Sequence, residues 1–317
     1  MIIMKQLLKD AERIKSLEIQ GATNVALSAI TYLDEYAKRL NCSNLENCFE
    51  KLTEAKQILI ETRPTEPAMQ NGLAYIMNQL NKCREDICAE DITGRIEEYK
   101  NVYHEMLLNS NKKIAEIGSR RIPEINNEDE EFVVMTHCHS SSVTAILLEA
   151  KRQGKNFTVV NTETQPKLQG RKTANELLEA GIEVIHVVDS AMRWAVNKLD
   201  VDLILIGADS ITSEGTVLNK IGSRLLALVA HEEHVPFYVC SPLLKYNPKT
   251  SFGILERIEM RDTEEIWEKK DKNLTILNPA FETVSRRYID GLITEAGIFA
   301  SSHVSEIFEK IYPELIE

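Results

Sequence analysis

The first 122 residues carry a helical pattern of hydrophobic positions. Between Ala22 and Leu40 the apolar residues are separated alternately by three positions and by one: Val25, Ala26, Ala29, Ile30, Leu33, Tyr36, Ala37 and Leu40. This spacing is typical of an amphipathic helix with one buried stripe. A similar rhythm runs from Ile96 to Ile117, and no strand-like alternation of any length interrupts the region. The pattern predicts a helical N-terminal domain over residues 1–122.

The pattern changes after Pro123, where the acidic stretch NNEDEE marks an expected domain boundary. Short, continuous apolar runs then predict strands at Phe132–Thr136, Phe157–Val160, Val184–Val188, Leu203–Ile206 and Pro236–Cys240. The segments between them predict helices ending near Gln153 and covering Lys172–Ala180, Met192–Lys198 and Leu218–Glu232. Alternating strands and helices with short links predict a parallel, Rossmann-like sheet covered on both faces. The expected fold is therefore α/β, with a Rossmann-like domain over residues 123–317 after the helical one.

Length and charge narrow the class of protein. The chain has 317 residues, which favours two domains over one core. Its 37 Lys and Arg against 49 Asp and Glu give a net charge of −12, which argues against broad nucleic-acid binding. An anionic ligand would need a local positive field from a few placed residues. The N-terminus is charged too early for a secretory leader, and no apolar run is long enough to span a bilayer, so we expect no membrane partner and a cytoplasmic location.

The cysteines and histidines give little sign of a metal or cofactor. The six cysteines form no C-x-x-C pair, so we expect them to be reduced. The run His137-Cys138-His139 is one metal cue, but His231–His234 reads H-E-E-H and lacks the spacing of a zinc helix. Neither a dinucleotide-binding glycine motif nor a P-loop is present in the sequence. We therefore expect no metal and no cofactor.

Candidate chemistry follows the predicted strands. In open parallel sheets the ligand lies beyond the carboxyl ends of the strands. Five polar segments occupy those positions: Thr136–Ser140, Glu163–Pro166 with Gln169–Arg171, Asp189-Ser190, Gly207–Asp209 and Cys240–Pro242. Helices begin just after several of them, and their free N–H groups favour an anion. The sequence therefore predicts an anion-binding crevice at this edge of the sheet.

Cys138 and Asp209 are the candidates for proton transfer. Cys138 precedes a predicted helix, whose N-terminus lowers a thiol pKa and favours the thiolate. A buried structural cysteine is an equally good interpretation from position alone. Asp209 closes an apolar strand, where a carboxyl either caps a helix, the commoner outcome, or has a raised pKa suited to proton transfer. Together in one crevice they would supply the two groups of opposite protonation state that an isomerase needs.

Asn219 and Lys220 are the candidates for holding a ligand. They lie at the start of the predicted helix Leu218–Glu232. Lys220 suits a phosphate or a sugar hydroxyl, and Asn219 suits an oxyanion. A solvated lysine is the ordinary alternative.

Several ordered motifs together resemble one known family. They are MTHCHSSS, ETQPKLQGRKTA, GADSITSEGTVLNKIGS, IEMRDTEEIW and NPAF. From about Ile14 to Gly297 the chain resembles the archaeal ribose-1,5-bisphosphate isomerases, whose superfamily includes methylthioribose-1-phosphate isomerase and the regulatory subunits of eukaryotic initiation factor two-B. The resemblance implies a helical N-terminal domain, a Rossmann-like C-terminal domain, and a homo-oligomer built from dimers and extending to a hexamer.

The resemblance also implies an activity. It is the aldose–ketose isomerisation of ribose 1,5-bisphosphate to ribulose 1,5-bisphosphate in nucleoside-monophosphate salvage, through an enolate-type intermediate and with AMP as an activator. Cys138 would abstract the proton as a thiolate, and Asp209 would assist ring opening. The substrate-binding residues implied by the motifs are Gln20, Gly21, Ala22, Arg63, His137, Gln165, Lys167, Arg171, Asn219, Lys220 and Lys245.

Two departures from the family pattern leave an alternative open. Gln20 and Gln165 stand where the family usually has arginine, which reads phosphate through two charged hydrogen bonds. Their loss predicts weaker bisphosphate binding or another phosphorylated sugar. It also allows a non-catalytic regulator of the initiation-factor type that senses a nucleotide or sugar phosphate. The presence of both Cys138 and Asp209 favours the enzyme.

Overall fold

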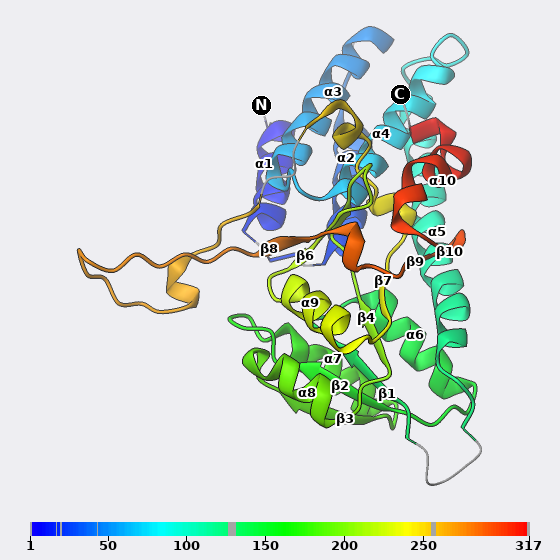
Figure 1. The fold of residues 1–317 in the computed structure, drawn as a ribbon. Coiled ribbons are helices and arrows are strands. Elements are labelled where there is room, and N and C mark those ends of the chain that lie inside the picture. Colours follow the sequence, from blue (N-terminus) through cyan, green and yellow to red (C-terminus); the bar gives the residue numbers. More distant parts are fainter. Residues whose placement is uncertain are drawn as a thin grey trace. The chain divides into compact units, whose positions relative to one another are not determined.

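The computed structural model describes residues 2–16, 18–19, 21–42, 44–125, 131–254 and 258–315 (Figure 1). The chain forms two compact units, Met1–Asn109 with Phe308–Glu317, and Ser110–Ile307. The boundary expected from the sequence, between residues 122 and 123, stays a prediction. Across the described ranges, no helix is both long and apolar enough to cross a membrane.

The first unit is made of helices. They are α1 (Ile2–Lys15), α2 (Ala22–Arg39), α3 (Leu45–Thr62), α4 (Pro67–Lys82), the first part of α5 (Ile92–Gly118) and the end of α10 (Val304–Ile311). The apolar stripe predicted along α2 is buried from Val25 to Ala37, and α2 packs against α1, α3 and α4. Local signals set the helix ends, because the Asn44 side chain caps α3 and Pro67 opens α4. The predicted helical pattern is confirmed here.

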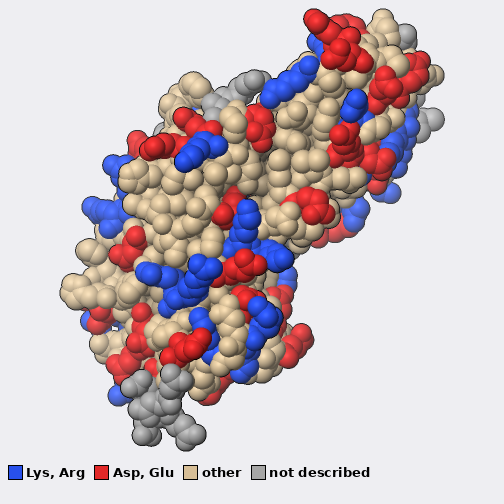
Figure 2. Space-filling model, turned by 90° about the vertical axis from the view of Figure 1, so that its right-hand side faces the viewer, with Lys and Arg blue, Asp and Glu red and all other residues tan. Residues whose placement is uncertain are grey.

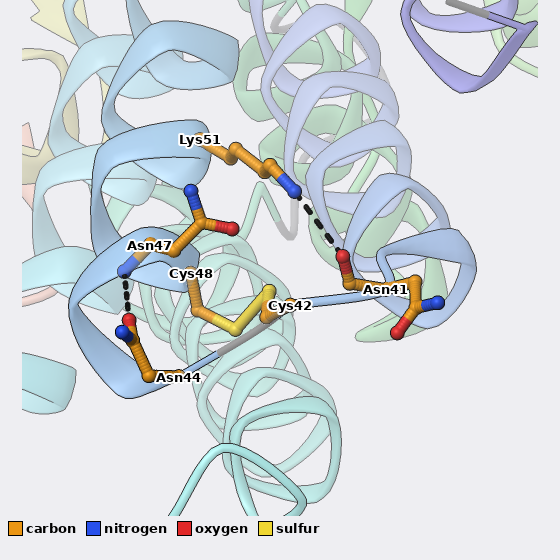
Figure 3. The surroundings of a disulfide bond; sticks show 6 residues. All are labelled: Asn41, Cys42, Asn44, Asn47, Cys48 and Lys51. Atoms are coloured by element: carbon orange, nitrogen blue, oxygen red, sulfur yellow. Dashed lines mark hydrogen bonds between the residues drawn. A yellow bond between two sulfur atoms is a disulfide. The ribbon is translucent and has the colours of Figure 1, made fainter.

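One expectation about the cysteines is wrong. Cys42 and Cys48 form a disulfide, whereas Cys83, Cys88, Cys138 and Cys240 are free (Figure 3). The chain turns sharply between α2 and α3, so the two cysteines lie with their Cα atoms 5.4 Å apart, within bridging range. The amide N–H of Asn47 donates to Asn44 Oδ1 at 2.9 Å and Lys51 Nζ donates to the Asn41 carbonyl at 3.2 Å, which braces the turn. A six-residue separation without a C-x-x-C motif gave no signal of this contact.

The second unit contains a seven-stranded sheet in the order β10-β9-β7-β4-β1-β2-β3. The strands are β1 (Val133–Thr136), β2 (Thr158–Thr162), β3 (Glu183–Val187), β4 (Leu203–Ile206), β7 (Phe237–Cys240), β9 (Gly291–Thr294) and β10 (Gly297–Phe299). Neighbours are parallel except the edge pair β9 and β10. The helices between them are α6 (Ser141–Arg152), α7 (Gln169–Glu179), α8 (Met192–Lys198) and α9 (Ser223–Glu233). The α/β fold class and the five strands expected from the sequence are confirmed.

The connections place the helices on both faces of this sheet. The chain runs from β1 outward to β2 and β3, then returns to β4 on the other side of β1. Right-handed crossovers therefore place α6 and α7 on one face and α8 and α9 on the other, as α6 and α9 lie in Figure 1. Val143, Leu147 and Leu177 of α6 and α7 share a buried cluster with Val134 and Leu205 of the strands. The order reverses between β1 and β4, which makes the gap beyond their carboxyl ends the expected ligand site.

A second, antiparallel sheet contains β5 (Ser210–Ile211) and β6 (Val217–Lys220), which follow β4 in the chain, and β8 (Phe281–Val284), which comes after β7. It corrects the expected helix over Leu218–Glu232, because α9 begins only at Ser223. The backbone at Gly222 has φ +104°, which interrupts a helix there, and Leu218 to Lys220 pair with β8 instead. Asn219 and Lys220 therefore lie at the end of a strand and not at the start of a helix.

Candidate active site

The sheet brings Cys138 and Asp209 to the same edge. Cys138 follows the end of β1 by two residues, and Asp209 follows the end of β4 by three. The two strands are parallel neighbours, with Met135 opposite Ile204, so their carboxyl ends lie side by side. Both residues are half-buried, and the charge of Asp209 raises the pKa of the Cys138 thiol. The two proton-transfer candidates thus lie together at the point where the strand order reverses.

The protonation state of Cys138 differs from the expectation. Burial is the main cause that raises the pKa of its thiol, to about 11. The ammonium of Lys220 opposes this shift, while the carboxylates of Asp209 and Asp189 add to it. The predicted lowering by the helix N-terminus is wrong because desolvation exceeds it, and the first turn of α6 is already capped by Ser140. In the absence of a ligand, Cys138 is a neutral thiol at pH 7.

His137 is buried and fully bonded within the protein. Its Nδ1 lies 2.6 Å from Thr162 Oγ1, and its Nε2 lies 2.8 Å from the carbonyl of Ile221. Because that carbonyl can only accept, Nε2 carries the hydrogen and Nδ1 accepts from Thr162. Burial lowers the pKa of His137, so the ring is neutral. His137 thereby links the end of β1 to β2 and to the residue after β6.

The Cys138 backbone has a left-handed conformation, with φ +68°. Its N–H donates to Thr164 Oγ1 at 3.0 Å, and its carbonyl accepts from Thr173 Oγ1 at 2.9 Å. Thr173 Oγ1 also lies 3.1 Å from Nδ1 of His139, whose pKa burial lowers to about 4. A non-glycine residue adopts this conformation at a cost, which these bonds on both sides offset.

Two lysines flank the pair. Lys220 Nζ lies 5.0 Å from the Phe281 ring centroid, and its charge acts on Cys138. Lys245, in the 3-10 helix Leu243–Lys245, is 8% exposed and donates to the carbonyl of Ala208 at 2.6 Å. Lys245 therefore holds the backbone directly before Asp209. The neighbouring Asn219 amide donates to Ser223 Oγ at 2.8 Å.

The loop after β2 holds its predicted cations in ion pairs. Arg171 forms an ion pair with Glu163, whose carboxylate also accepts a hydrogen bond from the side-chain amide of Gln165 at 3.2 Å. Lys167 Nζ lies 2.9 Å from Glu265 Oε1. Hydrogen bonds from Arg261 are the main reason that the pKa of Glu265 is lowered to about 2. An anion that binds here must compete with two carboxylates.

The remaining predicted residues belong to the first unit. Gly21 precedes α2 with φ +87°, and Ala22 is its buried first residue. Arg63 follows α3, is 8% exposed and lies 2.8 Å from Glu66 Oε1. Gln20 lies outside the described residues. Substrate-binding roles for these four stay predictions.

The sequence placed Asp189 among the polar segments at this edge but gave it no role, and it missed Glu282. Asp189 accepts hydrogen bonds from the amides of Thr164 and Gln165, and Thr164 in turn accepts from Cys138. Glu282 Oε1 accepts from the amides of Gly222 and Arg224, at 2.5 and 3.1 Å, and so occupies the N-terminus of α9. A polar residue after an apolar strand was the only available signal for Asp189. Glu282 gave no signal, since it lies about 60 residues from its partners.

Two kinds of charged site would bear on function: a cluster of metal ligands among the described residues, and a wide basic area on the face drawn in Figure 2. Among the described residues, no group of three or more His, Cys, Asp and Glu is placed to hold a metal ion. On the face drawn in Figure 2, lysine and arginine are interleaved with aspartate and glutamate. Around Cys138 and Asp209, Lys220 and Lys245 carry local positive charge.

Known proteins resemble this chain over nearly its whole length. It is 39% identical to the ribose 1,5-bisphosphate isomerase of Thermococcus kodakarensis, over 94% of this chain and 92% of that protein. The translation initiation factor eIF-2B of Pyrococcus horikoshii OT3 matches with a TM-score of 0.78 and 26% identity, covering 93% and 97%. The 5-methylthioribose 1-phosphate isomerase of the same organism matches with a TM-score of 0.76 and 25% identity, covering 97% and 87%. Residues 18–301, most of the chain, match the sequence pattern of the Initiation factor 2 subunit family, so the chain belongs to that family.

Proposed function

We propose that this chain is an aldose–ketose isomerase that converts ribose 1,5-bisphosphate to ribulose 1,5-bisphosphate. The observation that carries the proposal is the placement of Cys138 and Asp209 together at the switch point of the sheet, with Lys220 beside them. Relatives with 37–39% identity that are named ribose 1,5-bisphosphate isomerase support this choice of substrate.

The reaction needs one acid and one base that exchange roles. The anomeric oxygen of the substrate carries phosphate, so the furanose ring cannot open to an aldehyde unaided. Asp209 as a carboxyl gives a proton to the ring oxygen as the C1–O bond breaks, while the Cys138 thiolate removes the proton from C2. The resulting C1=C2 enol then takes a proton at C1 from the thiol, and its C2 hydroxyl proton returns to Asp209 as the ketone forms. Both groups end as they began.

The resting protein holds the proton of this pair on sulfur, because burial raises the pKa of Cys138 to about 11. The reaction begins from the reverse arrangement, a thiolate and a carboxyl. Transfer of one proton from Cys138 to Asp209 produces it without exchange with water. The ammonium of Lys220 favours this state, since it lowers the pKa of the thiol.

The phosphates would be held by the cations and amides at the same edge. Lys220 and Asn219 extend from the end of β6. The first turn of α7 has no side-chain cap, but its Gly170 and Arg171 amides already donate to the carbonyls of Glu163 and Leu168, at 3.2 and 3.0 Å. Lys167 and Arg171 would join only after leaving Glu265 and Glu163. Because these carboxylates compete with the ligand and Gln165 replaces a cation, we expect one phosphate to bind with lower affinity than in family members that have arginine there.

The direct test is turnover. Purified protein is incubated with the α-anomer of ribose 1,5-bisphosphate, and ketose formation is followed. Cys138→Ser should lower kcat by about 10³-fold or more, whereas Cys88→Ser, at an exposed free cysteine of the other unit, should not. A folded protein that turns over neither this sugar nor methylthioribose 1-phosphate would refute the proposal.

A non-catalytic regulator of the initiation-factor type is the second candidate. The match to the solved eIF-2B structure and the Gln165 substitution favour it. The Cys138–Asp209 pair has no use in such a protein, so we rank it below the isomerase. Recovery of a translation factor in a pull-down, together with no turnover, would reverse this ranking.

We also infer that the chain self-associates, with AMP as an activator of the assembled enzyme. In the segment between residues 258 and 280, which projects from the rest of its unit in Figure 1, Met260, Ile266, Trp267 and Leu277 are between 50% and 68% exposed. Exposed apolar side chains gathered on one segment typically lie in an interface. The double variant Trp267→Glu with Leu277→Glu should be monomeric by light scattering, whereas Trp194→Glu, an exposed tryptophan on α8, should not be. An AMP titration of kcat tests the activator.

A further inference from the structure

We propose that Asp189 is a positioning residue that sets the place of the Cys138 sulfur through Thr164; this rests on the proposed isomerase function. Asp189 opens the 3-10 helix Asp189–Ala191 after β3. Its Oδ1 accepts from the Thr164 amide at 2.8 Å, and its Oδ2 accepts from the Gln165 amide at 2.7 Å. Both carboxylate oxygens are therefore committed to one turn.

That turn carries the contact to Cys138. Thr164 is fully buried and has φ +63°, a conformation that points two successive amides at one acceptor. Its hydroxyl accepts from the Cys138 amide at 3.0 Å. The relay crosses three adjacent strand ends, from Asp189 after β3, through Thr164 after β2, to Cys138 after β1. Neither Asp189 nor Thr164 needs to touch the substrate for this role.

The relay matters because the conformation that it holds is costly. Cys138 and Thr164 both have left-handed backbones without being glycine. If the carboxylate were lost, the buried Thr164 amide would lose its acceptor, at a cost of about 1–3 kcal/mol, and the turn would relax. A shift of about 1 Å in a reacting group lowers a rate by roughly 10²-fold.

Asp189 also acts on the thiol through its charge. Three charged groups act on Cys138 from neighbouring elements: Lys220 at the end of β6, Asp209 after β4 and Asp189 after β3. On its own segment, His137 and His139 are neutral, since burial lowers the pKa of each. Lys220 lowers the pKa of the thiol, and the two carboxylates raise it. Removing Asp189 should therefore favour the thiolate as well as loosen the turn.

The two effects give a test that a merely structural residue would not pass. Asp189→Asn removes the charge and one acceptor. Asp202→Asn is the matched control, since Asp202 Oδ2 accepts from the Val133 amide at 2.8 Å, at the opposite edge of the same sheet. Two quantities are measured: kcat and KM for the bisphosphate, and the pH midpoint for alkylation of Cys138 by iodoacetamide without substrate, followed by mass spectrometry.

For Asp189→Asn we expect kcat to fall by about 10- to 100-fold, with KM changed by less than about threefold. The alkylation midpoint should fall, by less than in Asp209→Asn, because the Asp189 charge acts on the thiol less than the Asp209 charge does. Asp189→Glu should keep the midpoint and still lower kcat, and Asp202→Asn should change neither. The proposal would be overturned if Asp189→Asn kept both the alkylation midpoint and the kcat of the unmodified protein. It would also be overturned if Asp202→Asn changed both quantities equally.

Two further comparisons keep the test decisive. If Asp189→Asn does not fold, Thr164→Ser and Thr164→Val replace it, since serine keeps the hydroxyl that accepts from Cys138 and valine does not. Alkylation needs no substrate, so it tests Asp189 even if the chain is no isomerase. Undiminished turnover together with an unmoved midpoint in Asp189→Asn would leave the function standing and refute the role of Asp189.

Discussion

The links at the two ends of the strands of the seven-stranded sheet differ in geometry. We call these ends the amino edge, where the parallel strands begin, and the carboxyl edge, where they end. At the amino edge, each of the helices α6 to α9 is followed by a left-handed residue before the next strand: Gly154, Gly181, Asp200 and His234. This is the usual way to end a helix, and it is repeated there. At the carboxyl edge, the left-handed residues Cys138, Thr164 and Leu168 follow strands instead, and each link has its own geometry. The repeated links end helices, whereas the irregular links hold candidate site residues such as Cys138.

Aspartates at the two edges show the same contrast. At the amino edge, Asp202 and Asp290 each accept one backbone N–H, from Val133 at 2.8 Å and from Phe237 at 2.7 Å. They tie the start of one strand to the start of its neighbour. At the carboxyl edge, Asp189 holds a turn and Asp209 faces Cys138. Substitutions at the amino edge should therefore change stability, and those at the carboxyl edge should change activity.

The largest expected effect separates two aspartates. Asp209→Asn removes the proposed acid and should lower kcat by about 10²-fold or more, with the free energy of unfolding changed by less than about 0.5 kcal/mol. Asp290→Asn should cost about 1–2 kcal/mol of stability and leave kcat within about twofold. Urea unfolding and ketose assays on both variants measure this. Loss of activity in Asp290→Asn alone would break the comparison.

The next effect separates two glycines. A Cβ at Gly222 would lie 2.8 Å from His137 Nε2, at φ +104°, whereas one at Gly181, at φ +71°, would meet nothing within 4 Å. Gly222→Ala should therefore lose about 3 kcal/mol of stability and most of its activity, through displacement of His137. Gly181→Ala should lose about 1 kcal/mol and keep its activity. Thermal unfolding and kcat decide between these outcomes, and equal costs at the two sites would contradict the close approach at Gly222.

A smaller effect concerns alkaline pH. The folded pKa of Cys138, about 11, lies above its ordinary value of 9.0, so the native state keeps this proton longer than the unfolded chain. Its contribution to stability is complete below pH 9 and is lost as the pH rises through about 11. After allowance for partial exposure, the loss should be about 1–2 kcal/mol. Cys138→Ser should flatten this part of the urea-unfolding pH profile; an identical profile in the variant would mean that Cys138 is not the group involved.

The smallest expected effect lies at the start of α6. Ser140 caps this helix by accepting from the Val143 amide at 3.4 Å, a long bond. Ser140→Ala should cost about 0.5–1 kcal/mol and lower kcat less than about threefold, since Cys138 is held from Thr164 and Thr173. Denaturant midpoints and steady-state rates provide the check. A large drop in kcat would show that α6 itself positions the cysteine.

The sequence predicted what depends on local burial. Strands β1 and β4 are continuous apolar runs because both faces of the sheet are covered, and their ends located Cys138 and Asp209. Strand β6 was missed because Leu218 continues the apolar spacing of α9, and only the pairing with β8 shows that it is a strand. The same limit applies to Asp189 and the Cys42–Cys48 disulfide, whose partners are set by the folded chain. The thiol pKa was mispredicted because no sequence pattern measures desolvation.

The proton that the resting enzyme keeps on Cys138 also protects it. Oxidants such as peroxide attack the thiolate and not the thiol, and the first product is a sulfenic acid. With a pKa of about 11, only about one molecule in ten thousand carries the thiolate at pH 7. Under the proposed mechanism the thiolate forms for the reaction itself, when the substrate would cover the cysteine.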